Sequence, residues 1–445
     1  MKTKKYITAA VGMFAFAGLN QEAQALPMFS TQTGMDCKSC HLQHIPKLNE
    51  FGRKFAASGM TLSKKILDEN MTATDINPSV MVKSLYQKTW DKPGASGDVS
   101  TKSQTEDGEF SIPKTATLYL GGRVSENIGG LVNLSYKKEE DEAISAKAAY
   151  VQEIEDGFWG IVGSSFADFG PFSGMEFYNT GLYKPLRTFD MRTLSNAFQA
   201  SSIGTGESTG LQAYYDKGNL FGTGDHFFVT AGAYAPTQDN LYMDIADNIL
   251  PFARMAYLYP VGNFNVMMGA FAIAGGSTVA STESLSIERE TYGIDLQIEG
   301  EIAEKLVSLN VAKVLKNEVT YTGVGAGAVH ELDNLDNEAL SIEGEVNLTP
   351  DFGVKLAYMN YNDRYTYPDH DHGGGDDHEG EDHDHESTNQ FVDVRDLDHA
   401  ITVGLDYSFD FYLPMKASVE YCWAKPSLDR VKDYETLLFS LNMLF

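Results

Sequence analysis

The feature that most constrains the fold of this chain is the alternation of apolar and polar residues along its C-terminal part. From 434 to 445, one face carries the apolar side chains Leu437, Phe439, Leu441, Met443 and Phe445, whereas Ser440 and Asn442 lie on the other. The ranges 415–423, 401–409, 340–348 and 292–299 repeat this period, and their polar faces carry several acidic residues. A period of two is that of a β-strand with one apolar face. The sequence therefore predicts an all-β fold for residues 78–445.

The number and spacing of these segments predict a closed transmembrane barrel. About sixteen alternating segments of roughly ten residues follow Val80, an even number as in bacterial outer-membrane barrels. Short turns are expected at 126–129, 156–157, 262–263, 349–353 and 411–414, and long loops at 91–109, 169–207, 236–251, 274–285, 317–337 and 363–397. This asymmetry predicts an antiparallel barrel with periplasmic short turns and termini and extracellular long loops. A soluble β-sandwich or propeller is the alternative, but no blade repeat is visible and 23 Tyr and 25 Phe suit interfacial girdles.

The N-terminus has the pattern of an export signal. Lys2, Lys4 and Lys5 precede an apolar stretch from Ile7 to Leu19, and Ala23-Gln24-Ala25 is a small-residue cleavage site. Residues 1–25 are therefore predicted to be a signal peptide, and the mature chain to begin near Leu26. Export and the barrel together predict an outer-membrane location.

Between signal and barrel lies the sequence Cys37-Lys38-Ser39-Cys40-His41. Two thiols and an imidazole at this spacing are the attachment site of a c-type haem, with His41 as the proximal iron ligand. A redox dithiol and half of a zinc site are the alternatives. The sequence has no second cysteine pair to complete a zinc site, because Cys422 is the only other cysteine. One covalent haem c held by Cys37, Cys40 and His41 is the favoured interpretation.

The chain around this motif is too short for an independent cytochrome. Residues 26–77 comprise about fifty residues, which is small for a domain with its own core. Leu48, Phe51 and Phe55 recur at near-helical spacing, and Gly59 is a plausible helix stop. The segment is predicted to be helical and to lie inside or across the barrel lumen, which would supply the missing core.

The sixth ligand of the iron stays open. Met60 is the nearest methionine beyond the predicted helix and would give His/Met ligation with a raised potential. Met28, Met35 and Met71 are alternatives, whereas His44 is too close to His41 to reach the opposite face of the haem.

These residues resemble a known family. Phe29, Gly34 and the cysteine motif, followed by Pro46-Lys47-Leu48-Asn49-x-Phe51-Gly52-Arg53-x-Phe55, are similar to the fused monohaem cytochrome-porins, whose best-known members are the iron-oxidising outer-membrane cytochromes. The specific similarity spans only about Leu26 to Leu62. The resemblance implies a small cytochrome plugging or capping a sixteen-stranded barrel. It also implies electron transfer from an extracellular donor, typically Fe²⁺, to a periplasmic carrier cytochrome.

The expected loop at 363–397 is rich in histidine and acid. Its candidate metal ligands are His370, His372, His378, His383 and His385. Imidazole and carboxylate bind divalent transition metals, so the loop is either a capture site for Fe²⁺ or a similar ion, or a solvated segment without a unique geometry. The net charge of −28 favours cations and excludes nucleic acid as a partner.

Two classes of function follow from the sequence. The first is an outer-membrane electron conduit, with iron(II) oxidase activity as its enzymatic form and electron export as the reverse direction. The second is a porin or metal-uptake channel with a haem-bearing plug. The sequence shows no nucleophile triad or phosphate-binding loop that would support other chemistry.

Overall fold

The computed structural model describes residues 28–42, 47–62, 75–90, 107–137, 140–164, 186–188, 192–194, 208–236, 250–278, 285–325, 328–366, 390–392, 397–410, 413–426 and 433–445. These ranges are mostly β-strand, with three short helices near the N-terminus. No helix within them is long and apolar enough to cross a bilayer. The predicted signal peptide, residues 1–25, lies outside the described residues.

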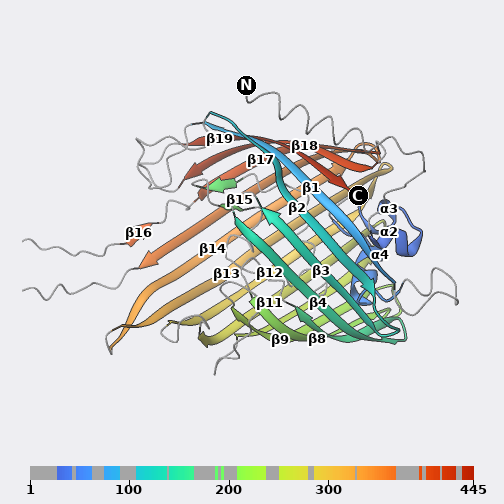
Figure 1. Cartoon of the computed structure of the whole chain (residues 1–445), viewed down its shortest axis with the longest axis horizontal. Helices are drawn as coiled ribbons and strands as arrows, with labels where there is room; N and C mark the ends of the chain where they lie inside the picture. The colour runs from blue at the N-terminus through green and yellow to red at the C-terminus, as the bar shows by residue number, and fades with distance from the viewer. Residues whose placement is uncertain are drawn as a thin grey trace, which may run out of the picture.

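Sixteen antiparallel strands close into a barrel (Figure 1), which confirms the predicted fold class. The barrel strands are β1 (Asp75–Trp90), β2 (Glu109–Arg123), β3 (Ile128–Lys137), β4 (Glu140–Ile154), β5 (Gly157–Ser164), β8 (Ser208–Gly218), β9 (His226–Pro236), β10 (Leu250–Val261), β11 (Phe264–Thr278), β12 (Leu285–Ile302), β13 (Lys305–Gly325), β14 (Ala328–Asn347), β15 (Phe352–Thr366), β17 (Leu397–Asp410), β18 (Pro414–Pro426) and β19 (Tyr434–Leu444). Each pairs with the next, and β1 pairs with β19 from Met81↔Leu444 to Trp90↔Glu435. Because the last strand completes the ladder of the first, the barrel leaves no open edge. Three short strands lie outside this circuit: β6 (Leu186–Thr188) pairs only with β7 (Arg192–Leu194), and β16 (Gln390–Val392) pairs with the end of β15.

The two faces of the wall are opposite in character to those of a soluble protein. In β18 the polar Lys416, Ser418 and Glu420 are buried, whereas Val419 and Tyr421 are about 40% exposed. Burial alternates in the same way along β10 and β19, although the buried face of β10 is apolar except for Arg254. A wall that buries polar groups inside and exposes apolar groups outside is suited to lipid around it. The alternation read from the sequence is therefore the division between lumen and membrane faces.

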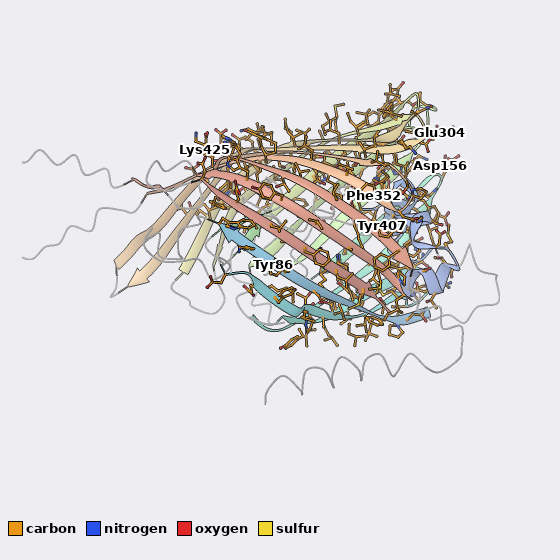
Figure 2. All side chains as sticks on the ribbon, turned by 90° about the horizontal axis from the view of Figure 1, so that it is seen from above. Tyr86, Asp156, Glu304, Phe352, Tyr407 and Lys425 are labelled. Atoms are coloured by element: carbon orange, nitrogen blue, oxygen red, sulfur yellow. The ribbon has the colours of Figure 1, made fainter. Side chains whose placement is uncertain are left out.

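Short turns gather at one end of the barrel, which we call the short-turn end. They lie at 124–127, 155–156, 219–225, 262–263, 303–304 and 348–351. Asp156 and Glu304 adopt the left-handed conformation that such tight turns need, with φ of 54° and 60°. In Figure 2 both lie at the end where the helices are, whereas Tyr86 and Lys425 lie toward the other end.

One predicted loop is wrong. Residues 317–337 were expected to form a long connection, but β13 and β14 continue their ladder through Asn317↔Asn337 to Gly325↔Ala328. Glycine, asparagine and aspartate in this stretch are weak strand formers, yet cross-strand pairing overrides that preference. Most of the predicted loop at 363–397 lies outside the described residues.

The lumen is arranged in layers. Toward the long-loop end, buried apolar residues from β10 to β19 form one cluster: Leu250, Phe252, Phe271, Ile273, Ala312, Val314, Ala339, Met359, Tyr361, Ala400, Cys422, Ala424 and Tyr434. Buried ion pairs lie on the short-turn side of this cluster: Arg254 pairs with Asp295, and Asp406 pairs with both Lys355 and Lys416. A second apolar cluster lies closer to the short-turn end, on the β4–β11 side.

The helical segment lies at the short-turn end (Figure 1). It consists of α2 (Met28–Thr33), α3 (Cys37–Cys40) and α4 (Glu50–Ala57). Phe55, Ala57 and Met60 belong to the second apolar cluster, together with inward-facing residues of β4, β5 and β8 to β11. The segment therefore lies against the lumen side of the wall, where the barrel supplies its core. The predicted helix is confirmed at 50–57, although Leu48 lies just before it.

Candidate functional site

Cys37, Cys40 and His41 are held on a single turn. Asp36 caps α3, because its carboxylate accepts hydrogen bonds from the Ser39 amide at 3.0 Å and the Ser39 hydroxyl at 2.9 Å. The His41 amide donates to the Cys37 carbonyl at 2.9 Å, and the backbone then becomes extended. Both cysteines are half-buried and carry thiols rather than a disulfide. The turn thus presents two thiols and an imidazole at adjacent positions.

Helix α4 fixes this turn from behind. Asn49 caps α4 by accepting from the Gly52 amide at 2.9 Å, and its side-chain amide donates to the Ser39 carbonyl at 3.1 Å. The backbone N–H of Asn49 also donates to the Cys40 carbonyl at 2.9 Å. Gly52 allows the close approach, because a Cβ there would lie 2.1 Å from the Cys40 oxygen. Turn and helix therefore form one unit.

The surroundings of Cys40 disfavour the ionised form of its thiol. Partial burial, and then the carboxylate of Asp36, raise the pKa of the Cys40 thiol above its ordinary value. The attacking cysteine of a redox pair has a lowered pKa, because the thiolate is the attacking species, so Cys40 does not have the properties of an attacking thiol. Cys40 is therefore a neutral thiol at physiological pH.

Polar contacts bind α4 to the barrel. The Arg53 guanidinium makes a two-pronged ion pair with Glu299 of β12, with one Nη1–Oε2 distance of 3.0 Å. Both side chains are largely buried, at 12% and 14% exposure. The Tyr214 hydroxyl donates to the Ala57 carbonyl at the other end of the helix. A bidentate, shielded ion pair is among the stronger charge interactions, so α4 is docked in one orientation.

Further contacts secure the rest of the segment. Gln32 Nε2 donates to the Gly121 carbonyl of β2 at 2.7 Å, and Lys38 pairs with Asp351 in the turn before β15 at 2.7 Å. The chain after α4 lies backbone to backbone against β3, since a Cβ at Gly129 would lie 1.7 Å from the Gly59 oxygen. The segment is thus attached to the wall on several sides.

A cavity of about 40 Å³ remains between α4 and the wall. Glu50, Arg53, Lys54, Asp216 and His226 provide its polar lining. A polar space of this size has room for water. Sequence periodicity places Glu299 on the polar face of its strand, but it did not indicate that Glu299 and Tyr214 bind α4, because their partners in the helical segment lie far away in the chain. Periodicity gave no signal for Asp216 or His226.

The candidate sixth ligands differ in their surroundings. Met60 is 5% exposed with φ of 66° and packs in the apolar cluster around Phe55. Met28 is buried against Gly121, whereas Met35 is half-buried. His44 and Met71 lie outside the described residues, so the choice of Met60 stays a prediction.

The other predicted metal ligands are not brought to this turn. His370, His372, His378, His383 and His385 lie outside the described residues. Within the described ranges, no three His, Cys, Asp or Glu side chains are grouped to hold a metal ion. Cys422 is buried in the long-loop cluster, on the lumen face of β18.

No protein-family model and no curated protein matches the chain. Solved structures similar to it include the outer membrane channel DcaP of Acinetobacter baumannii, with 13% identity over 83% of this chain and 97% of that one and a TM-score of 0.46. An anion-selective porin from Comamonas acidovorans has 10% identity over 83% of this chain and 99% of that one, with a TM-score of 0.45. OmpF of Salmonella typhi, in a complex with daunomycin, has 12% identity over 84% of this chain and 98% of that one, with a TM-score of 0.45. At this similarity the function of the chain has to come from its own residues.

Proposed function

We propose that the chain is an outer-membrane electron-transfer protein that passes electrons from extracellular Fe²⁺ to a periplasmic carrier cytochrome through one covalently bound haem c. The observation that carries this proposal is the attachment of the Cys37-to-His41 turn to α4 and to the turn before β15, at the short-turn end of the barrel. We assign that end to the periplasm, as the expected position of short turns.

The residues present fit a c-type haem. Cys37 and Cys40 would form the thioether links from one helical turn, and His41, the next residue, would ligate the iron. Once bound, the haem supplies a one-electron carrier. The chain would hold it through the Cys37-to-His41 turn, which Asn49 and α4 fix in place, and α4 itself packs in the apolar cluster around Phe55. A drier, less polar surrounding is one of the factors that set a haem potential.

The burial of the lumen favours electrons over solutes as the cargo. Barrels of sixteen to eighteen strands leave an aqueous channel when their lumen is open. Many of the described lumen-facing residues are almost fully buried, including Ala149, Ala312 and Ser440 at 1% exposure or less, although Asn133 and Ser135 of β3 are half-buried. Such burial supports a closed lumen that separates the two sides of the membrane.

Charge supports a cationic donor. The net charge of −28 attracts cations toward the protein and lowers the affinity for anionic solutes. Fe²⁺ as donor rests on this charge and on the family resemblance. Electron export to an extracellular acceptor is the same chemistry in reverse.

The second candidate is a porin or metal-uptake channel with a haem-bearing plug. It is favoured by the position of the helical segment in the mouth of a barrel, where Lys38 and Asp351 form an exposed ion pair that a small movement would break. This reading requires the segment to move. The buried contacts of Arg53 and Tyr214 oppose such movement.

A sided vesicle experiment separates the two candidates. The haem-loaded protein is reconstituted into liposomes that contain oxidised cytochrome c, and Fe²⁺ is added outside. We expect reduction of the enclosed cytochrome without liposome swelling or ion conductance, whereas the Cys40→Ala variant should reduce it far more slowly. Solute flux without internal reduction contradicts the conduit and supports the channel.

Met60 as the sixth ligand has a spectroscopic test. Its burial means that truncation to alanine would cost about 2–5 kcal/mol whatever its role, so Met60→Leu, which conserves volume, is the better variant. We expect the far-red absorption band of a Met–iron bond in the wild type, and its loss together with a lowered potential in Met60→Leu. Met28→Leu and Met35→Leu are matched controls. A band that survives in Met60→Leu but disappears in either control assigns the ligand to that methionine instead.

A further inference from the structure

An apolar groove of about 440 Å³ lies on the membrane face of the barrel across β11 to β15. Its apolar walls are Phe264, Ile298, Ile302, Val307, Leu309, Val346, Val354 and Leu356, and Gly344 is part of its lining. These residues belong to the outward-facing rows of their strands. Its volume falls within the range of sites that bind small molecules.

The groove exists because one outward position lacks a side chain. Leu309 of β13 and Leu356 of β15 both pair with Gly344, so the glycine lies between two large residues. A Cβ at Gly344 would have no neighbouring heavy atom closer than the Ser308 carbonyl at 4.0 Å. The outward Gly300 differs, because Phe264 fills the space beside it and a Cβ there would lie 2.6 Å from that ring. Gly344 is therefore an unfilled notch in an otherwise bulky apolar surface.

A basic residue marks the end of the groove. Ile302, which lines it, is joined through the turn at 303–304 to Lys305, and Lys305 shares the outward face of β13 with Val307 and Leu309. Lys305 is exposed, and the turn lies at the short-turn end, where the protein meets the lipid headgroups. Lysine at this depth extends its ammonium toward the interface. Apolar walls that end at an ammonium match a ligand with a hydrocarbon chain and a phosphate.

We propose that this groove binds one phospholipid of the surrounding leaflet, with an acyl chain along Gly344 and the phosphate at Lys305. An empty groove facing hydrocarbon would lose contacts on its lining, so a chain that fits it is held more tightly than bulk lipid. The site is independent of the haem. Its failure or success leaves the electron-transfer proposal untouched.

Native mass spectrometry of the full chain tests the site, with phosphatidylethanolamine titrated into detergent-solubilised protein. We expect one high-affinity lipid on the wild type, weaker binding by Gly344→Ala and loss of that lipid in Gly344→Leu. Lys305→Gln should weaken binding about tenfold, because one charge-assisted hydrogen bond is lost. Gly163→Leu, at an outward position of β5 remote from the groove, is the matched control and should bind like the wild type.

Several results overturn the proposal. Retention of the lipid by Gly344→Leu shows that it binds elsewhere. Equal affinity for a diacylglycerol without phosphate removes the role of Lys305. A wild-type dimer that Gly344→Leu converts to monomer, with no bound lipid in either, shows that a second copy of the chain covers the groove instead.

Discussion

The double variant Cys37→Ala/Cys40→Ala is expected to lose all covalently bound haem while the barrel still folds. The two sulfurs are the only groups in the turn that can form thioethers, and neither contributes a disulfide to the fold. The wall is held by its own sixteen-strand ladder, whose contacts do not involve these thiols. Haem staining of a denaturing gel and the pyridine haemochrome spectrum measure attachment, and heat-modifiable gel mobility measures the folded barrel.

Two variants make this result specific. Cys422→Ala removes the third cysteine, which is buried in the long-loop cluster, and should keep full haem content. His41→Ala retains both thiols, so any haem attached to it should show an altered spectrum because the axial ligand is missing. Covalent haem in the double cysteine variant would contradict haem attachment at Cys37 and Cys40, on which the proposed function depends.

The barrel was predictable because apolar and polar residues alternate along each strand, and this alternation assigns them to its two faces. In β18, for example, Val419 and Tyr421 lie on one side, and Lys416 and Glu420 lie on the other. The period of two along a strand assigns these sides without knowledge of the neighbouring strands. The extension of β13 and β14 beyond Asn317 was not predictable in this way. The β14 part of the extension has low strand preference, because residues 333–337 include two Asp and two Asn. The stabilising pairing comes from β13, whose residues 319–322 are strand formers.

In the candidate site, too, the sequence identified the local motif but not the contacts between distant parts of the chain. Cys37, Cys40 and His41 form a motif within five residues, so spacing alone identified them. The contacts that fix their position join distant parts of the chain, as between Arg53 and Glu299, which are 246 residues apart. The role of Gly344 was hidden for a related reason. A glycine in a strand shows what it leaves open only when its cross-strand neighbours are known.

Gly52→Ala sets two effects of opposite sign against each other. In an ordinary helix interior the change stabilises by about 1 kcal/mol, because alanine has the better helix propensity. At Gly52 the new Cβ would lie 2.1 Å from the Cys40 carbonyl oxygen and 3.0 Å from Leu48 Cδ2. The oxygen belongs to the backbone, so no rotamer change relieves the contact. Inserting a carbon into a tight contact costs about 1–3 kcal/mol or more, so steric conflict should exceed the gain in propensity.

We expect Gly52→Ala to separate α4 from the attachment turn, because relief of the contact requires breaking the Asn49 hydrogen bonds to Cys40 and Ser39. Amide hydrogen exchange in residues 47–57 should become faster, and the yield of covalent haem should fall several-fold. Lys54→Ala, an exposed change in the same helix with nearly equal propensity, is the matched control. Slower exchange in Gly52→Ala than in the wild type would show that propensity outweighs the contact. That result would contradict the close fit of α4 against the Cys37-to-His41 turn.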